Sequence, residues 1–150
     1  MLEFKTIDDI LDFAIVQEIA ARELYTKLSG ETPDRDRQLF YRTLAEEEAV
    51  HEKKLRELKR RQFDLNPPDM QQLQDSGYLD ALPLTPEMTL REVVRYALKK
   101  EKSARMLYKV LADSMLQPDL ADLFRELAAE EAKHAAFFSK EYDALAAEQD

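Results

Sequence analysis

Hydrophobic residues recur every three to four positions in four segments of the chain, which is the spacing of one face of an amphipathic α-helix. Capping and helix-breaking residues bound these segments. Thr6 and Thr89 are N-cap candidates, the pair Ser29 and Gly30 is predicted to stop the first helix, and Pro118 opens the fourth. The predicted helices span about residues 6–29, 34–61, 90–113 and 118–147.

The segment between the second and third helices is predicted to cross from one end of the fold to the other. It contains Pro67, Pro68, Gly77 and two further prolines, so it cannot be one continuous helix. About 25 residues can easily run the roughly 36 Å of a 24-residue helix, whereas the other two connections are short and must join antiparallel neighbours. The pattern predicts an all-α four-helix bundle built from two antiparallel helical hairpins. We expect one domain over residues 1–150, with hairpin 6–61, crossover 62–86 and hairpin 89–147.

The second half of the chain repeats the first at an offset of 83 residues, as Tyr25 and Tyr108 illustrate. Near the middle of each half, Leu39-Phe40 matches Leu123-Phe124 better, which shifts the register by one residue. We attribute this shift to joining loops of different length.

Composition and charge restrict the chemistry. The chain has no Cys, which excludes disulfides, thiol nucleophiles, Cys-ligated zinc and iron–sulfur clusters. A net charge of −9 argues against nucleic acid or an anionic membrane as partner. The N-terminus lacks a basic segment followed by an apolar run, and no stretch reaches the roughly 18 apolar residues of a membrane span. We therefore expect a cytoplasmic protein whose metal chemistry uses oxygen and nitrogen ligands.

Two copies of a Glu-x-x-His tetrapeptide carry the only two histidines of the chain. Residues three apart lie on one face of a helix, so each copy offers a carboxylate and an imidazole to a single point in space. Two further glutamates lie mid-helix in the apolar rows of the first and third helices. The candidate metal ligands are Glu18, Glu48, His51, Glu101, Glu131 and His134.

Four buried carboxylates without counter-charge would cost several kcal/mol per ion. Two divalent cations would balance the four glutamates, so the charges favour a dinuclear site. With twofold symmetry, Glu48 and Glu131 would bridge both metals, and each metal would take one more glutamate and one histidine. These pairs are Glu18 with His51 and Glu101 with His134. Such ligands suit iron or manganese. The alternative interpretation is a polar core network without metal.

Two aromatic and two basic residues accompany the candidate ligands. Tyr25 and Tyr108 follow a candidate glutamate by seven residues on the same helix face, and could donate a hydrogen bond to a ligand carboxylate. Ordinary core packing is the alternative for both. Arg22 and Arg105 lie one turn after the same glutamates. They could pair with a carboxylate such as Glu47 or its counterpart Glu130, and a surface pair four residues apart is the alternative.

The motifs Glu18-x-x-Ala21-Arg22-x-x-Tyr25 and Leu44-Ala45-x-x-Glu48-x-x-His51, with their second-half copies, resemble the ferritin-like domain of the rubrerythrin family. The resemblance covers both hairpins. It implies a ferritin-like four-helix bundle with a non-haem di-iron centre that reduces hydrogen peroxide or O₂.

Two features differ from the usual rubrerythrin pattern. Rubrerythrins generally carry a rubredoxin domain whose paired Cys residues serve electron delivery, so a chain without Cys implies a separate electron-donor protein. They also tend to carry a further Glu one turn after the third-helix ligand, where Ala104 stands here. The resulting six-residue ligand set is symmetric, and is more similar to that of bacterioferritin or manganese catalase.

The sequence leaves three functions open. The leading one is a redox enzyme with two iron ions, or manganese in their place, that reduces hydrogen peroxide or O₂ and uses no catalytic residue apart from the metal ligands. The second is iron handling by a ferroxidase. The third is a metal-free helical interaction module.

A homodimer interface is predicted on the first helix. Val16 and Ile19 align with Lys99 and Lys102 of the third helix, so an outward face that is charged in one half is apolar in the other. With Ile15 beside them, this face is expected to bind a second copy of the chain. Coverage by the crossover segment is the alternative.

Overall fold

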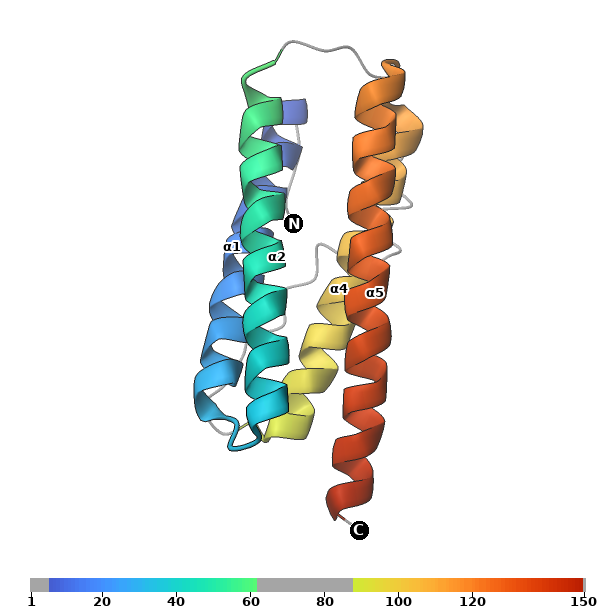
Figure 1. Ribbon diagram of the computed structural model, residues 1–150. Helices are drawn as coiled ribbons and strands as arrows, with labels where there is room; N and C mark the ends of the chain where they lie inside the picture. Colours follow the sequence, from blue (N-terminus) through green and yellow to red (C-terminus); the bar gives the residue numbers. More distant parts are fainter. Residues whose placement is uncertain (1–5, 62–87, 150) are drawn as a thin grey trace. The chain divides into compact units, whose positions relative to one another are not determined.

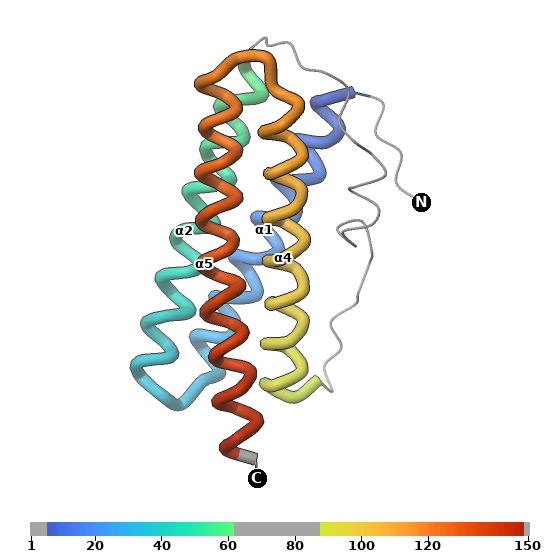
Figure 2. The backbone as a smooth tube through the Cα atoms, turned by 90° about the vertical axis from the view of Figure 1, so that its right-hand side faces the viewer, coloured from blue at the N-terminus to red at the C-terminus, as the bar shows by residue number. Residues whose placement is uncertain are grey.

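The computed structural model describes residues 6–61 and 88–149, which form four α-helices and no β-strand. The chain divides into two compact units of two helices each. In the first unit α1 (Ile7–Glu31) packs against α2 (Arg35–Lys59), and in the second α4 (Leu90–Ser114) packs against α5 (Pro118–Gln149). The helices of each pair run side by side in opposite directions (Figure 1, Figure 2). The two predicted antiparallel hairpins are confirmed.

The predicted crossover at residues 62–86 lies outside the described residues. That residues 1–150 form a single domain stays a prediction.

Side-chain caps start three of the helices, and two of these caps, Thr6 and Thr89, are the predicted ones. The hydroxyl of Thr6 accepts a hydrogen bond from the Asp9 amide at 3.2 Å, and the Asp9 carboxylate accepts one from the Thr6 amide at 3.1 Å. Thr89 caps α4 by accepting from the Glu92 amide at 3.2 Å. Asp34 caps α2 by accepting from two backbone amides. These bonds satisfy amides that have no partner inside a helix.

The first helix does not stop at Ser29 and Gly30, so that prediction is wrong by about two residues. It continues to Glu31, and Thr32 ends it in an extended conformation with φ −88° and ψ 127°. The physical reason is Pro33, because the residue before a proline is pushed out of the helical region. Glycine plays no part in this termination.

Gln38 holds the turn between α1 and α2 through one hydrogen bond from its side chain and one to its backbone carbonyl. Nε2 of Gln38 donates a hydrogen bond to the carbonyl oxygen of Thr32 at 2.6 Å. The hydroxyl of Ser29 donates to the carbonyl oxygen of Gln38 at 2.9 Å. The last turn of α1 and the first turn of α2 are thereby tied together.

The two hairpins keep the offset of 83 residues throughout, so the predicted register shift is wrong. The equivalent helix ends are Ile7 and Leu90, Glu31 and Ser114, and Arg35 and Pro118. The joining loops have equal length, and Tyr41 is the counterpart of Phe124, with both side chains fully buried. Leu39 and Phe40 are 49% and 45% exposed. The match of Leu39-Phe40 to Leu123-Phe124 therefore reflects residue type, not position in the fold.

Each hairpin buries a row of large apolar and aromatic side chains. In the first hairpin these include Leu11, Tyr25, Leu28, Tyr41, Leu55 and Leu58. In the second they include Leu107, Tyr108, Leu111, Leu120, Phe124 and Phe138. The rings of Tyr108 and Phe124 stack with centroids 6.1 Å apart. The six predicted metal ligands lie in these same rows.

In the part of the chain that the structure describes, none of the helices combines the length and apolar character that crossing a membrane requires.

Gly30 gives a direct test of the helix end. It lies inside α1, its φ is outside the left-handed range, and an added Cβ would meet nothing within 4 Å. Gly30→Ala should raise the free energy of unfolding by about 0.5–1 kcal/mol, because alanine has the higher helix propensity and restricts the unfolded chain. Urea denaturation of the variant and the parent measures this difference.

A second substitution at the same position serves as the control. Gly30→Asn should fall between the parent and Gly30→Ala in stability, as helix propensity ranks them. If Gly30→Asn proved more stable than Gly30→Ala, the position would be a left-handed cap and the described helix end would be wrong.

Candidate metal centre

The structure places all six predicted ligands in buried positions near the middle of their helices. Glu18 lies on α1 and Glu101 on α4, while the two Glu-x-x-His motifs lie on α2 and α5. None of the six side chains is more than 3% exposed. Ionisable side chains are rarely this buried unless a counter-charge compensates them.

In the first hairpin, His51 lies between two glutamates. Its Nδ1 atom is 3.5 Å from Oε2 of Glu18 and 3.8 Å from Oε2 of Glu48. Each of the three side chains offers one ligand atom, and these atoms lie within 4.8 Å of one another. We call Glu18, Glu48 and His51 the first triad.

The second hairpin repeats this arrangement. Nδ1 of His134 is 3.5 Å from Oε1 of Glu101 and 3.5 Å from Oε2 of Glu131. The three ligand atoms again lie within 4.8 Å of one another. Glu101, Glu131 and His134 form the second triad, so the duplication extends from the sequence to the spacing of individual atoms.

These spacings suit a metal ion better than direct hydrogen bonds. A hydrogen bond brings its two heavy atoms to about 2.7–3.2 Å, and the imidazole-to-carboxylate separations exceed this range. Two ligand atoms that each lie about 2.1 Å from one ion, at a tetrahedral angle, are about 3.4 Å apart. The donor set of carboxylate oxygens and imidazole nitrogen fits iron or manganese. Each triad could therefore hold a metal ion.

Comparison with known proteins agrees with this chemistry. The family model described as rubrerythrin matches residues 9–79 and 92–150. The chain belongs to the rubrerythrin family. Searches of curated proteins and of solved structures gave no match. Family membership, together with four helices in the described residues, confirms the expected all-α, ferritin-like four-helix fold. Rubrerythrins are di-iron carboxylate proteins, which is the chemistry the triads suit.

Two tyrosines of this rubrerythrin domain are buried as predicted. Tyr25 is 1% exposed and Tyr108 is fully buried. The stacking of Tyr108 on Phe124 agrees with a packing role. A hydrogen bond from either tyrosine to a ligand carboxylate stays a prediction.

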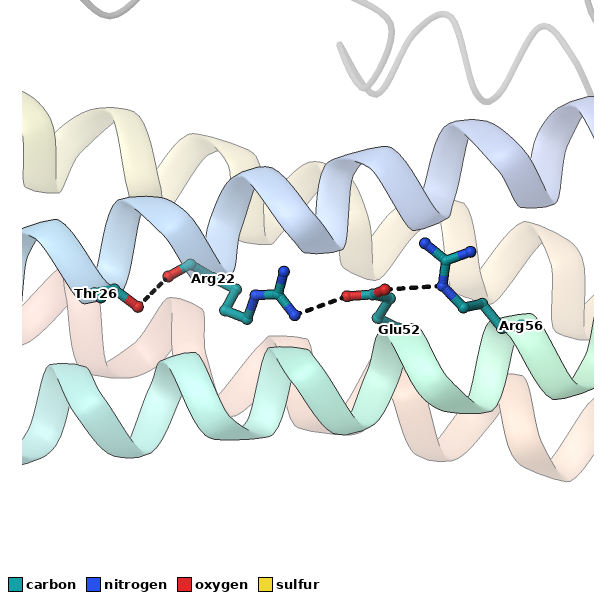
Figure 3. A network of polar contacts seen from close by, with 4 residues as sticks. All are labelled: Arg22, Thr26, Glu52 and Arg56. Carbon is teal, nitrogen blue, oxygen red and sulfur yellow. Dashed lines mark hydrogen bonds and ion pairs between the residues drawn. The ribbon is translucent and has the colours of Figure 1, made fainter.

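Arg22 has a partner that the sequence did not predict. Its Nη1 atom donates a hydrogen bond to Oε1 of Glu52 at 3.0 Å, and thereby joins α1 to α2 (Figure 3). Oε2 of Glu52 accepts a second bond, from Nε of Arg56 at 2.8 Å. Among the contacts described, Glu47 does not pair with Arg22, and the residue four positions on, Thr26, donates its hydroxyl hydrogen to the backbone carbonyl oxygen of Arg22 at 2.8 Å and not to a charged partner of the guanidinium. Arg22 and Glu52 line the same cleft between α1 and α2, which brings their side chains together.

Two residues, Glu52 and Glu141, are not among the candidates predicted from the sequence, although they differ from their counterparts in the other half of the chain. Glu52 corresponds to Ala135, so directly after the triad histidine the first hairpin has a carboxylate where the second has a small apolar residue. Glu141 corresponds to Leu58 and is only 8% exposed. Differences between duplicated positions mark where one hairpin has acquired a feature of its own.

The buried charge of the triads can be tested without any metal. Glu48→Gln combined with Glu131→Gln removes one carboxylate from each triad while keeping its shape. In the presence of a chelator, this double variant should be more stable than the parent by at least about 1 kcal/mol, because a neutral amide is less costly to bury than a carboxylate beside another. Urea denaturation provides the measurement.

Glu47→Gln with Glu130→Gln is the matched control, since these residues directly precede the triad glutamates. It should change stability by less than about 0.5 kcal/mol. With Fe²⁺ or Mn²⁺ present, the order of parent and triad variant should reverse. A triad variant that stays the more stable protein with metal present would favour the metal-free interaction module.

Proposed function

We propose that this chain is a non-haem di-iron redox protein that reduces hydrogen peroxide or O₂, with electrons from a separate donor protein. The observation that carries the proposal is the pair of matching buried triads, each with two carboxylates and one imidazole at metal-ligand spacing. Rubrerythrin family membership supports it independently.

In the proposed centre the two triads supply all the ligands of two metal ions. Glu48 and Glu131 would be the carboxylates shared by the two ions, and each ion would be held by one further glutamate and one histidine. The four carboxylates balance two divalent cations, which explains why such a concentration of charge is tolerated in the rows of buried side chains. Manganese is the alternative metal.

The chemistry supplied by two bound iron ions is the donation of one electron each to the oxidant. Hydrogen peroxide then takes up two electrons and two protons and yields two water molecules. The protein side chains hold and orient the metals, and no side chain is itself the redox group. The 150 residues contain no Cys and so no Cys-ligated iron. We therefore propose that the electrons come from a redox group outside these residues.

Iron oxidation is a second candidate, and Ala104 is the observation that favours it. Rubrerythrins tend to carry a further glutamate at this point, and its absence leaves the symmetric six-residue ligand set. In this alternative, iron is the substrate and leaves the site after oxidation. The two candidates predict different results after a single turnover: Fe³⁺ stays bound in the redox enzyme and leaves the site in iron oxidation.

Metal stoichiometry tests the proposed centre. Anaerobic titration of the metal-free protein with Fe²⁺ should give two equivalents per chain. His51→Ala and His134→Ala should each leave one tight equivalent, because each removes a ligand of one ion. Loss of a residue that merely supports a ligand costs about 10–100-fold in affinity, so loss of a ligand should cost more. Rapid mixing of the diferrous protein with hydrogen peroxide and with O₂ then identifies the preferred oxidant. A protein that binds neither iron nor manganese would refute the proposal.

We also propose a homodimer that uses the outward face of α1. Val16 is 58% exposed, Ile19 is half-buried and Ile15 is only 5% exposed. Of these three residues, Val16 is therefore the most accessible to a second copy of the chain. The alternative of coverage by the crossover segment concerns residues outside the described part of the chain. Val16→Lys combined with Ile19→Lys should convert the dimer to monomers in sedimentation experiments. An unchanged dimer would show that the interface lies elsewhere.

A further inference from the structure

A cleft of about 250 Å³ lies on the first hairpin, lined entirely by residues of α1 and α2. Arg22 and Glu52 meet across it, and Arg56 extends the network along α2 (Figure 3). The remaining charged residues that line it are Lys53, Glu57 and Arg60. The cleft does not contain any of the six triad side chains.

The cleft carries a positive surplus on an acidic protein. Four basic side chains line it against two acidic ones, which leaves two positive charges, while the whole chain has a net charge of −9. Glu52 already accepts from both Arg22 and Arg56. Among the residues that the structure describes, Lys53 and Arg60 form no ion pair. Their charge is therefore available to an anionic partner.

The metal triads do not require this cluster, because the second hairpin builds its triad without it. The residues of the second hairpin that correspond to Arg22, Glu52, Lys53, Arg56 and Arg60 are Arg105, Ala135, Ala136, Ser139 and Asp143. Of these five counterparts, only Arg105 is basic. The basic cleft is thus a property of the first hairpin alone.

The cleft also lies directly beside the first triad along the chain. Ala49, which lines it, follows Glu48, and Glu52 follows His51. Arg22 lies one helical turn after Glu18. Three of the residues that line the cleft therefore lie next to a member of the first triad or one helical turn from it.

We propose that this basic cleft is the docking site of the electron donor, a redox protein that presents Asp and Glu side chains around its redox group. This proposal rests on the proposed function. Charge complementarity selects the partner, because an acidic donor is repelled by the net charge of the chain and attracted by the basic side chains of the cleft. Two one-electron transfers from the donor supply the two electrons that reduce one hydrogen peroxide, with two protons from water, to two water molecules.

The binding arm of the test uses fluorescently labelled hexaglutamate as the probe and needs no metal turnover. Lys53→Glu combined with Arg60→Glu should weaken binding at low salt by at least tenfold, and Lys53→Gln with Arg60→Gln should give an intermediate loss. The matched control is Lys109→Glu with Lys140→Glu, which makes the same charge change at exposed positions of the second hairpin. It should change the affinity less than twofold. Circular dichroism confirms that every variant folds.

The kinetic arm reduces the oxidised, iron-loaded protein with anionic dithionite or with the cationic radical of methyl viologen. The Lys53 and Arg60 charge-reversal variant should slow reduction by dithionite at least threefold relative to the Lys109 and Lys140 control, while reduction by methyl viologen should not slow.

The outcomes separate the docking site from the proposed function. Suppose that the protein binds two Fe and reacts with peroxide, but the Lys53 and Arg60 charge-reversal variant behaves like the Lys109 and Lys140 control in both the binding and the kinetic experiment. The docking proposal is then refuted and the function stands. If inorganic phosphate binds in the cleft and hexaglutamate does not compete with it, the cleft is a small-anion site and the docking proposal is equally refuted. Failure to bind iron, with hexaglutamate binding intact and sensitive to Lys53 and Arg60, would refute the proposed function while an acidic-partner site remained.

Discussion

The burial of four carboxylates and two imidazoles is the constraint on which the rest of this structure depends. Each of these side chains occupies a position that an apolar residue would fill in an ordinary helical core, and none is more than 3% exposed. The surrounding rows of leucine, tyrosine and phenylalanine provide the apolar contacts that favour folding, and the triads oppose it by removing charge from water. The proposed binding of cations would offset the free-energy cost of burying these charges.

The two halves of the duplicated chain bury their ionisable side chains in the same arrangement. The starts of all four helices, the ends of α1 and α4, the N-cap threonines and the 3.5 Å separations of His51 from Glu18 and of His134 from Glu101 recur at one offset of 83 residues. Equal loops preserve the rotation of the second helix of each hairpin against the first, and that rotation decides which side chains meet. Where the halves differ, as at Glu52 and Ala135, the difference lies on positions that the triad does not use.

The helices and the burial of the six triad residues could be predicted from the sequence, because periodicity and capping are local signals. The helix end after Gly30 was harder, because glycine is a common stop signal while Pro33 acts through the residue before it. The register of Leu39-Phe40 was misjudged because residue types matched where exposures do not. The Arg22–Glu52 contact depends on how two helices are rotated against each other, which periodicity alone does not determine. Carboxylate and imidazole side chains suit more than one metal, so the sequence does not identify the ion that the candidate ligands would hold.

Each triad lies inside a single hairpin, whose helices are joined by three residues, and this has a consequence for how the protein matures. All contacts that bring Glu18, Glu48 and His51 together are local to one compact unit, and such contacts form early because little chain entropy is lost in closing them. The same holds for the second triad. Each half of the ligand set is thus complete once its own hairpin has formed. Under the proposed function, the first hairpin would therefore present its three candidate ligands to a metal ion before the second hairpin has been synthesised.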